Sequence, residues 1–420
     1  MDKIILNSNG YDVAVQSAES NNVFATVYSN SLGFTLVENS TVDISATYTA
    51  SSRRLQIDVT EPHGFTLKNR SLVTLYLPES CAPVIEFVNN SANTTINASN
   101  LTLSGLSYKT TKGNLNLANG TFNGSLKIDI GNATCTINES AVTATNDVNL
   151  QIGEGKFDAP SKDFNNFTIA SNVRGVIIMK SCQLLTQTES ENAGGRLNIE
   201  TLNNSNYVSG DTNVSITNML KGNINLTKSG SINIENCTGS ASYLTTLTGS
   251  ISVNNAEANI QANSSYGNIT INNANNFIST KTNGKATINF KDNATGARHL
   301  DARTTNGSIN VTGVNLLEAT ATGVGSVKAM MHDVASGCNV KVSQGNANII
   351  FADGDKFTLY VTQADGGSFY FEDLATPNPI TSIPTDGKII VNGDTENISF
   401  NIESSQGGSI RIVDKSMSNY

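Results

Sequence analysis

A short pattern that begins with glycine recurs along this sequence, and it limits the possible folds more than any other feature. Each unit reads glycine, a polar residue, an apolar residue, any residue and a second apolar residue, as in residues 230–234 (GSINI). The units begin at Gly113, Gly124, Gly195, Gly222, Gly230, Gly249, Gly267, Gly284, Gly307, Gly325, Gly345, Gly367, Gly387 and Gly408. From Gly249 onward the successive intervals are 18, 17, 23, 18, 20, 22, 20 and 21 residues. A fixed period of this length is typical of repeat architectures.

Apolar and polar residues alternate within each unit, which places the aliphatic side chains on one face of a β-strand. Stacking the units buries that face, because each strand pairs with the equivalent strands above and below it and the aliphatic side chains share one core. The leading glycine fits a corner with a positive φ or a corner where two backbones approach closely. The sequence therefore predicts an all-β fold, a parallel β-solenoid (a single-stranded β-helix) with rungs of about 20 residues.

Weaker strands are expected between the glycine units. They are residues 258–262, 277–280, 316–319, 339–342 and 357–361. A rung would then contain two or three short strands with corners between them. A β-sandwich is the competing architecture, but its strands recur every ~8–12 residues without a shared motif. The regular glycine spacing favours the solenoid.

The expected strands are spaced less regularly in the first part of the chain. Apolar runs with irregular spacing predict strands at residues 4–6, 12–15, 23–27, 42–49, 55–59 and 72–77. We expect residues 1–85 to form an N-terminal β cap or irregular first rungs, residues 86–413 to form the solenoid repeats, and residues 414–420 to form a polar tail. A cap would protect the open sheet edge that a solenoid exposes at its end.

Charge and cysteine content exclude several classes of function. The formal net charge is −9, whereas nucleic-acid backbones are bound by clustered Lys and Arg, so no nucleic-acid partner is expected. The five cysteines are far apart and form no metal or redox motif, so we expect small apolar core residues, with one disulfide if two fall on neighbouring rungs. No segment has the roughly 18–20 apolar residues that cross a bilayer. We expect no metal, no cofactor and no catalytic residue.

The repeat resembles a family of adhesin-like β-repeat proteins known as domain of unknown function 4097. The resemblance is carried by residues 72–78 (LVTLYLP) and by the glycine units at residues 230–234, 267–271 and 307–311, and it extends over nearly the whole chain. This chain departs from the family by using asparagine in place of a charge-rich surface. The resemblance implies a β-solenoid fold at the cell surface, and it brings no catalytic residue to this chain.

The repeat region, rather than the first residues, indicates where the protein is located. The first residues lack the apolar segment and the cleavage site of a signal peptide. The body is nevertheless typical of an extracellular or cell-surface protein, so we expect any signal or anchor to lie outside this sequence. N-glycosylation sequences are frequent, but an Asn-, Ser- and Thr-rich chain also produces them by chance.

Two groups of charged residues are candidates for carbohydrate chemistry. Asp353 and Asp355 follow an apolar strand, and Asp301 and Arg303 lie close to His299 in the sequence. Cleavage of a polysaccharide needs two carboxylates about 5–10 Å apart. The acids do not recur in phase with the repeat, so a polar corner is the simpler interpretation of Asp353 and Asp355.

Aromatic residues concentrate near the C-terminal end. Alternation turns Phe369 and Phe371 toward the core and Tyr370 outward. Filling of the core explains most of these side chains. Tyr360 and Tyr370, together with the acids Asp353 and Asp355, are candidate contacts for a carbohydrate.

The sequence as a whole favours a non-enzymatic protein that acts as an adhesion-type binding scaffold or a rigid spacer, with a carbohydrate or a surface protein as partner. One alternative is a carbohydrate-active β-helix enzyme, a polysaccharide lyase or hydrolase whose groove is built by residues distant in sequence. Another is a self-assembling structural subunit that associates end to end through its terminal rungs.

Overall fold

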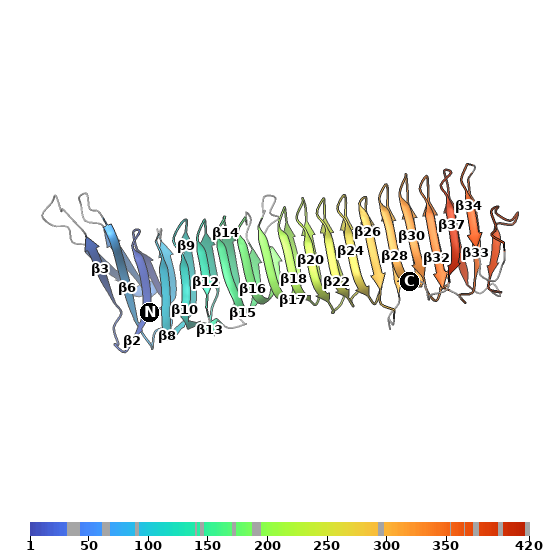
Figure 1. The fold of residues 1–420 in the computed structure, drawn as a ribbon. Helices are drawn as coiled ribbons and strands as arrows, with labels where there is room; N and C mark the ends of the chain where they lie inside the picture. Colours follow the sequence, from blue (N-terminus) through green and yellow to red (C-terminus); the bar gives the residue numbers. More distant parts are fainter. Residues whose placement is uncertain are drawn as a thin grey trace. The chain divides into compact units, whose positions relative to one another are not determined.

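The structure is a computed structural model, and it describes residues 1–31, 43–60, 68–88, 92–138, 141–142, 147–169, 174–186, 195–292, 298–352, 354–364, 366–372, 378–393 and 398–415. Regular structure in these residues is β, apart from one 3-10 turn at Ala50–Ser52. The chain forms two compact units, Met1–Asn213 and Val214–Tyr420. Figure 1 shows successive strands stacked within each of them.

The strands of the first unit are β1 (Lys3–Asn7), β2 (Asp12–Ala18), β3 (Phe24–Ser31), β4 (Asp43–Thr49), β5 (Arg54–Thr60), β6 (Lys68–Pro78), β7 (Val84–Val88), β8 (Thr94–Leu103), β9 (Gly105–Thr110), β10 (Leu115–Phe122), β11 (Leu126–Ile130), β12 (Thr134–Ile137), β13 (Ala141–Val142), β14 (Val148–Ile152), β15 (Lys156–Ile169), β16 (Val176–Thr186) and β17 (Arg196–Ser209). The first six confirm the strands expected in this region, except that residue 23 precedes β3 and residue 42 lies outside the described residues.

The strands that follow are β18 (Asn213–Met219), β19 (Gly222–Leu226), β20 (Ile232–Cys237), β21 (Ser242–Thr246), β22 (Ile251–Ala256), β23 (Ile260–Ser264), β24 (Ile269–Ala274), β25 (Ile278–Thr282), β26 (Lys285–Phe290), β27 (His299–Thr304), β28 (Ser308–Val314), β29 (Leu316–Ala321), β30 (Ser326–Met331), β31 (Cys338–Val342), β32 (Ala347–Ala352), β33 (Phe357–Gln363), β34 (Phe369–Glu372), β35 (Lys388–Val391), β36 (Ser399–Ser404) and β37 (Ile410–Lys415).

Each rung of the second unit contributes one strand to each of two parallel sheets. The first sheet runs through β18, β20, β22, β24, β26, β28, β30 and β32. The second sheet runs through β19, β21, β23, β25, β27, β29 and β31. Register partners such as Ile251 and Ile269 lie about twenty residues apart in the chain. The predicted parallel β-solenoid, with its weaker second strand in each rung, is confirmed.

The core of the second unit is the stack of aliphatic side chains that the alternation predicts. Ile232, Ile251, Ile269 and Ile309 occupy equivalent positions of the first-sheet strands β20, β22, β24 and β28 and are at most 1% exposed. Burial of one such side chain stabilises the fold by about 1.5–3 kcal/mol. Stability is therefore spread along the stack rather than concentrated in one site.

Close backbone approach, rather than a positive φ, explains the repeated glycines. A Cβ atom added to Gly267 would lie 1.9 Å from the carbonyl oxygen of Gly249, and one added to Gly249 would lie 2.0 Å from that of Gly230. The glycines of successive rungs thus lie directly on one another. Gly222 and Gly387 differ, since their φ angles are 137° and 68°.

A buried hydroxyl fixes each of these corners. Ser264 Oγ donates to the carbonyl of Gly249 at 3.0 Å and accepts from the N–H of Gly267 at 2.8 Å. Thr246 makes the same pair of bonds one rung earlier. The corner therefore has a defined shape, because the hydroxyl ties each rung to the preceding one.

Asparagine side chains form ladders between rungs. The amide of Asn236 donates to Asn218 at 3.0 Å, that of Asn255 donates to Asn236 at 2.8 Å, and that of Asn273 donates to Asn255 at 2.9 Å. Such stacked amides satisfy one another along a parallel sheet. The high asparagine content is thus partly structural.

The chain order changes at the C-terminal end of the second unit. In one sheet β36 pairs with β31 on one side and β33 on the other. In the other sheet β37 pairs with β32 and β34 in the same way. The last two strands of the chain are therefore inserted between strands that precede them in the sequence. Figure 1 shows β37 next to β32. The glycine units therefore do not stack in chain order here: Gly408 follows Gly345 in space and Gly367 follows Gly408. The unit at Gly387 forms β35, which is antiparallel to β33.

The first unit has the same exchange at its N-terminal end. The strand β1 pairs in parallel with both β5 and β7, and β2 pairs with both β6 and β8. The outer strands β5 and β6 are each joined by an antiparallel neighbour, β4 and β3. The domain limits expected from the sequence, residues 1–85, 86–413 and 414–420, stay a prediction.

The cysteines lie in the core as single thiols. Cys135, Cys182, Cys237 and Cys338 are buried, Cys81 is half-buried, and all five are free. Within the described ranges, no helix is long and apolar enough to span a membrane.

Candidate functional site

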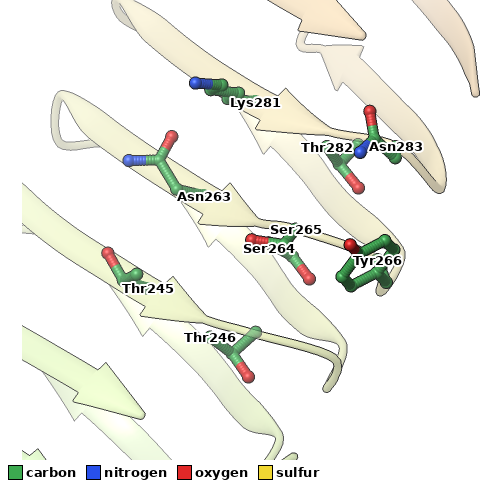
Figure 2. Close-up of a pocket in the computed structure, with 9 residues that line it drawn as sticks. All are labelled: Thr245, Thr246, Asn263, Ser264, Ser265, Tyr266, Lys281, Thr282 and Asn283. Carbon is green, nitrogen blue, oxygen red and sulfur yellow. The ribbon is translucent and has the colours of Figure 1, made fainter. Parts of the chain in front are cut away.

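The second unit has a polar recess at the corner that follows three strands of the second sheet. Its volume is about 450 Å³. Three successive rungs build it, each with the last outward residue of a strand and the corner after it (Figure 2). We call it the corner recess, and its residues are Thr245, Thr246, Asn263, Ser264, Ser265, Tyr266, Lys281, Thr282 and Asn283.

Hydrogen bonds to the backbone hold the floor of the corner recess. Thr246, Ser264 and Thr282 are buried, and their hydroxyls donate to the glycine carbonyls of the preceding rungs. These hydroxyls hold the corners and are therefore engaged within the fold. The groups open to a ligand are those of the outward residues, which stand on strands fixed by parallel pairing.

The outward side chains of the corner recess offer hydrogen bonds, one ring face and one positive charge. Thr245, Asn263 and Lys281 are register partners on β21, β23 and β25, and Figure 2 shows them on the same side of the sheet. Tyr266 is 67% exposed at the corner. Asn283 accepts the N–H of Thr305 through Oδ1. Its Nδ2 takes no part in that bond and can donate to a ligand.

The electrostatics of this face differ from those of the whole chain. From β19 to β25 the eight outward positions of the second sheet contain no acid. They are Asn223, Asn225, Tyr243, Thr245, Gln261, Asn263, Ser279 and Lys281. Among the described residues, no carboxylate forms an ion pair with Lys281, whose neighbour Arg303 is paired with Asp301 at 3.3 Å. The corner recess is thus locally cationic within a chain of net charge −9.

The aromatic residues singled out in the sequence lie on different sheets. Tyr360 is on β33, opposite Asn401, and is 38% exposed. Tyr370 is on β34, donates its hydroxyl to Glu372 at 2.9 Å, and carries the guanidinium of Arg411 over its ring. That bond to Glu372 also raises the pKa of Tyr370. Phe369 and Phe371 are buried, as the alternation predicts. The structure does not bring the two tyrosines together on one sheet.

The two acids singled out beside them are only partly described. Asp353 lies outside the described residues. Asp355 is half-buried, and burial together with the charge of Asp333 raises its pKa. The role of Asp353, Asp355, Tyr360 and Tyr370 in carbohydrate binding stays a prediction.

The second charged group of the sequence analysis is divided among separate pairs. Asp301 and Arg303 pair with each other along β27. His299 lies 2.9 Å from Glu318 and packs against the ring of Phe277. The His299 contacts connect neighbouring rungs, and both described carboxylates at this position, Asp301 and Glu318, have a partner.

A corner cluster near β30 was missed by sequence reasoning, because its members are distant in the chain. Arg298 is 7% exposed, and its Nη2 donates to Asp333 Oδ2 at 2.6 Å. His332 Nδ1 lies 2.7 Å from the same oxygen. Burial opposes ionisation of Asp333, but the bonds and charges of Arg298 and His332 outweigh it and lower the pKa of that carboxyl. The buried guanidinium thus has a paired charge.

Sequence reasoning also missed the corner recess. A Ser or Thr precedes the glycine by two or three residues at Thr246, Ser264 and Thr282, and this signal marks the corner. The outward partners cannot be found this way, because which residues meet depends on the register between rungs. In the described residues no group of three or more His, Cys, Asp or Glu side chains could hold a metal ion.

Curated proteins and solved structures add no support for a particular function. No curated protein gives a significant match to the chain. A solved structure of a provisionally named cell adhesion protein from Clostridium sporogenes is 8% identical, with 99% of this chain and 92% of that chain covered and a TM-score of 0.15. That likeness is too low to support any statement about this chain.

A family model, Toastrack DUF4097, matches residues 159–349. The matched residues contain the corner recess and the glycine units at residues 230–234, 267–271 and 307–311. They do not contain residues 72–78, so the match is shorter than the resemblance expected over nearly the whole chain. The match over residues 159–349 is to the family that the repeat resembles.

Proposed function

We propose that this protein is a non-enzymatic extracellular scaffold that binds a carbohydrate through the polar face of its second unit. The observation that carries the proposal is the corner recess, where outward Thr245, Asn263, Tyr266 and Lys281 meet on a frame fixed by buried hydroxyls. Polyhydroxylated ligands need many hydrogen-bonding groups and a ring face. A rigid frame supplies these with little loss of conformational entropy on binding.

The lining of the corner recess supports binding over cleavage. None of its nine residues is an acid. Glycoside hydrolysis uses two carboxylates on either side of the scissile bond, and general acid–base catalysis needs a titratable group within reach of the reacting atoms. Lys281 alone does not provide that pair.

The capping of the outer strands weighs against end-to-end assembly. In the first unit, β3 and β4 are antiparallel to β6 and β5, and in the second unit β35 is antiparallel to β33. An antiparallel neighbour interrupts the parallel pattern that a second copy would have to continue. A scaffold that presents its side faces is therefore favoured over a subunit that stacks through its end rungs.

Incubation with a panel of polysaccharides tests the proposal. Retention of the protein on one or more immobilised glycans is measured together with release of new reducing or unsaturated ends. We expect retention without product release. Product release that persists through repurification of the protein would replace the scaffold by a carbohydrate-active enzyme, and the absence of retention on every glycan would leave the binding function without support.

A further inference from the structure

We infer that the corner recess selects acidic saccharides, with Lys281 recognising the carboxylate or sulfate and Tyr266 stacking on the sugar ring. This inference rests on the proposed function and names its ligand class. The main evidence is the ammonium of Lys281, which no described carboxylate neutralises. An ammonium that pairs with no carboxylate of the described residues is available to a ligand anion.

Cations occur on both sides of the corner recess along the stack. Lys228 lies at the same corner two rungs before Tyr266, since the N–H of Leu247 donates to the carbonyl of Lys228 and the N–H of Tyr266 donates to that of Leu247. Arg303 lies one rung beyond Lys281, as its register partner, but it is paired with Asp301. Neighbouring strands are spaced by about 4.8 Å. The positive charge available along this side of the stack is therefore that of Lys228 and Lys281, whose spacing over several rungs suits a polymer that carries an acid on each residue.

The exposed ring at the corner supplies the apolar part of the site. Tyr266 is 67% exposed, so its ring face is open to stacking on a sugar ring. The open Nδ2 of Asn283 and the hydroxyl of Ser265 lie in the same recess and can bond to ring hydroxyls. A ring face, neutral donors and one cation together fit a sugar acid better than a small anion such as phosphate.

Two ligands that differ only in charge test the inference. Polygalacturonate carries a carboxylate on each residue, and its methyl ester keeps the sugar but removes the charge. The protein is produced in a host without N-glycosylation, because residues 263–265 (NSS) form a glycosylation sequence inside the corner recess. We expect wild-type protein to bind the acid at least about tenfold more tightly than the ester, the scale of a hydrogen bond to a charged group. The difference should shrink at high salt, since exposed charges are screened.

Two variants separate charge from stacking. Lys281→Gln should reduce binding of the acid about tenfold and leave binding of the ester unchanged, whereas Tyr266→Ala should weaken both ligands equally. The matched control is Lys328→Gln, which removes an exposed lysine from β30 of the other sheet and should change neither. Thermal unfolding of each variant verifies that the fold is intact.

The remaining outcomes overturn the inference in distinguishable ways. Equal binding of acid and ester, or a Lys281→Gln variant that binds like wild type, rejects the acidic selectivity and leaves the scaffold proposal intact. Absence of binding to both polymers also rejects it. In that case retention on another glycan of the panel decides whether the scaffold proposal survives.

Discussion

Replacing Gly267 by alanine tests the explanation of the repeated glycines. The new Cβ would lie 1.9 Å from the carbonyl oxygen of Gly249, where real contacts of this kind are above 3.0 Å. The Cβ would clash with the backbone of the preceding rung, which cannot rotate away like a side chain. The two rungs must therefore separate by about 1 Å. Overpacking of this kind costs ~1–3 kcal/mol in a protein core. The separation also weakens the two hydrogen bonds of Ser264, each contributing about 1 kcal/mol.

The expected loss of stability for Gly267→Ala is therefore roughly 3–5 kcal/mol. Gly393→Ala is the control, because Gly393 has a φ of 69° and no atom within 4 Å of its added Cβ. Its left-handed backbone alone predicts a cost of about 1–2 kcal/mol.

Guanidinium unfolding followed by tyrosine fluorescence measures the two variants, since the chain has no tryptophan. Repeat proteins do not always unfold in a single step, so amide hydrogen exchange in β22 and β24 gives the local effect. A Gly267→Ala variant as stable as wild type, or less destabilised than Gly393→Ala, would refute close backbone approach as the reason for the glycine.

Four further results are expected. Ile269→Asp should cost several kcal/mol because it buries an unpaired charge at a fully buried position, and unchanged thermal unfolding would contradict the inward assignment. Ser264→Ala should cost about 1–3 kcal/mol, measured by denaturant unfolding, because two buried partners lose their bond; a neutral result would remove the hydroxyl from the corner. Burial raises the pKa of the Cys182 thiol from 9.0 to about 12, so stability present below pH 9 should fall as the pH rises toward 12, and Cys182→Ala should flatten that decline in pH-dependent unfolding. Removal of residues 399–415 should expose β31–β34 to rapid hydrogen exchange, since β36 and β37 lie between them; continued protection would contradict the observed strand order.

The sequence predicted the regular part of the fold from purely local information. Alternation around Ile251 and Ile269 places both side chains in the core, and the glycine period sets the rung length. These features depend only on residues close in the chain. The strands of the N-terminal region were found for the same reason.

The exchange of strand order could not be predicted this way. Residues 399–404 (SFNIES) alternate like any other rung strand, and their pattern does not say whether β36 pairs with β33 alone or enters between β31 and β33. Strand partners are chosen by packing over the whole unit. A sequence repeat defines the rung but does not define its place in the stack.

The residues of the candidate site could not be predicted either, because they meet only through the register between rungs. Asn263 and Lys281 are separated by a full rung, and they meet because β23 and β25 pair in this register. Tyr266 belongs to a corner, where alternation makes no prediction. The aromatic pattern of the sequence instead favoured Tyr360 and Tyr370, whose strands lie in different sheets.

Hydrogen exchange of the protein with and without polygalacturonate tests the central claim most directly, because it locates the bound ligand without assuming the site. The account predicts slower exchange at the three corners that build the corner recess, residues 245–249, 263–267 and 281–284, with little change on the opposite sheet. Protection confined to the opposite sheet or to the first unit would contradict the account, since the ligand would then be held by a surface other than the corner recess.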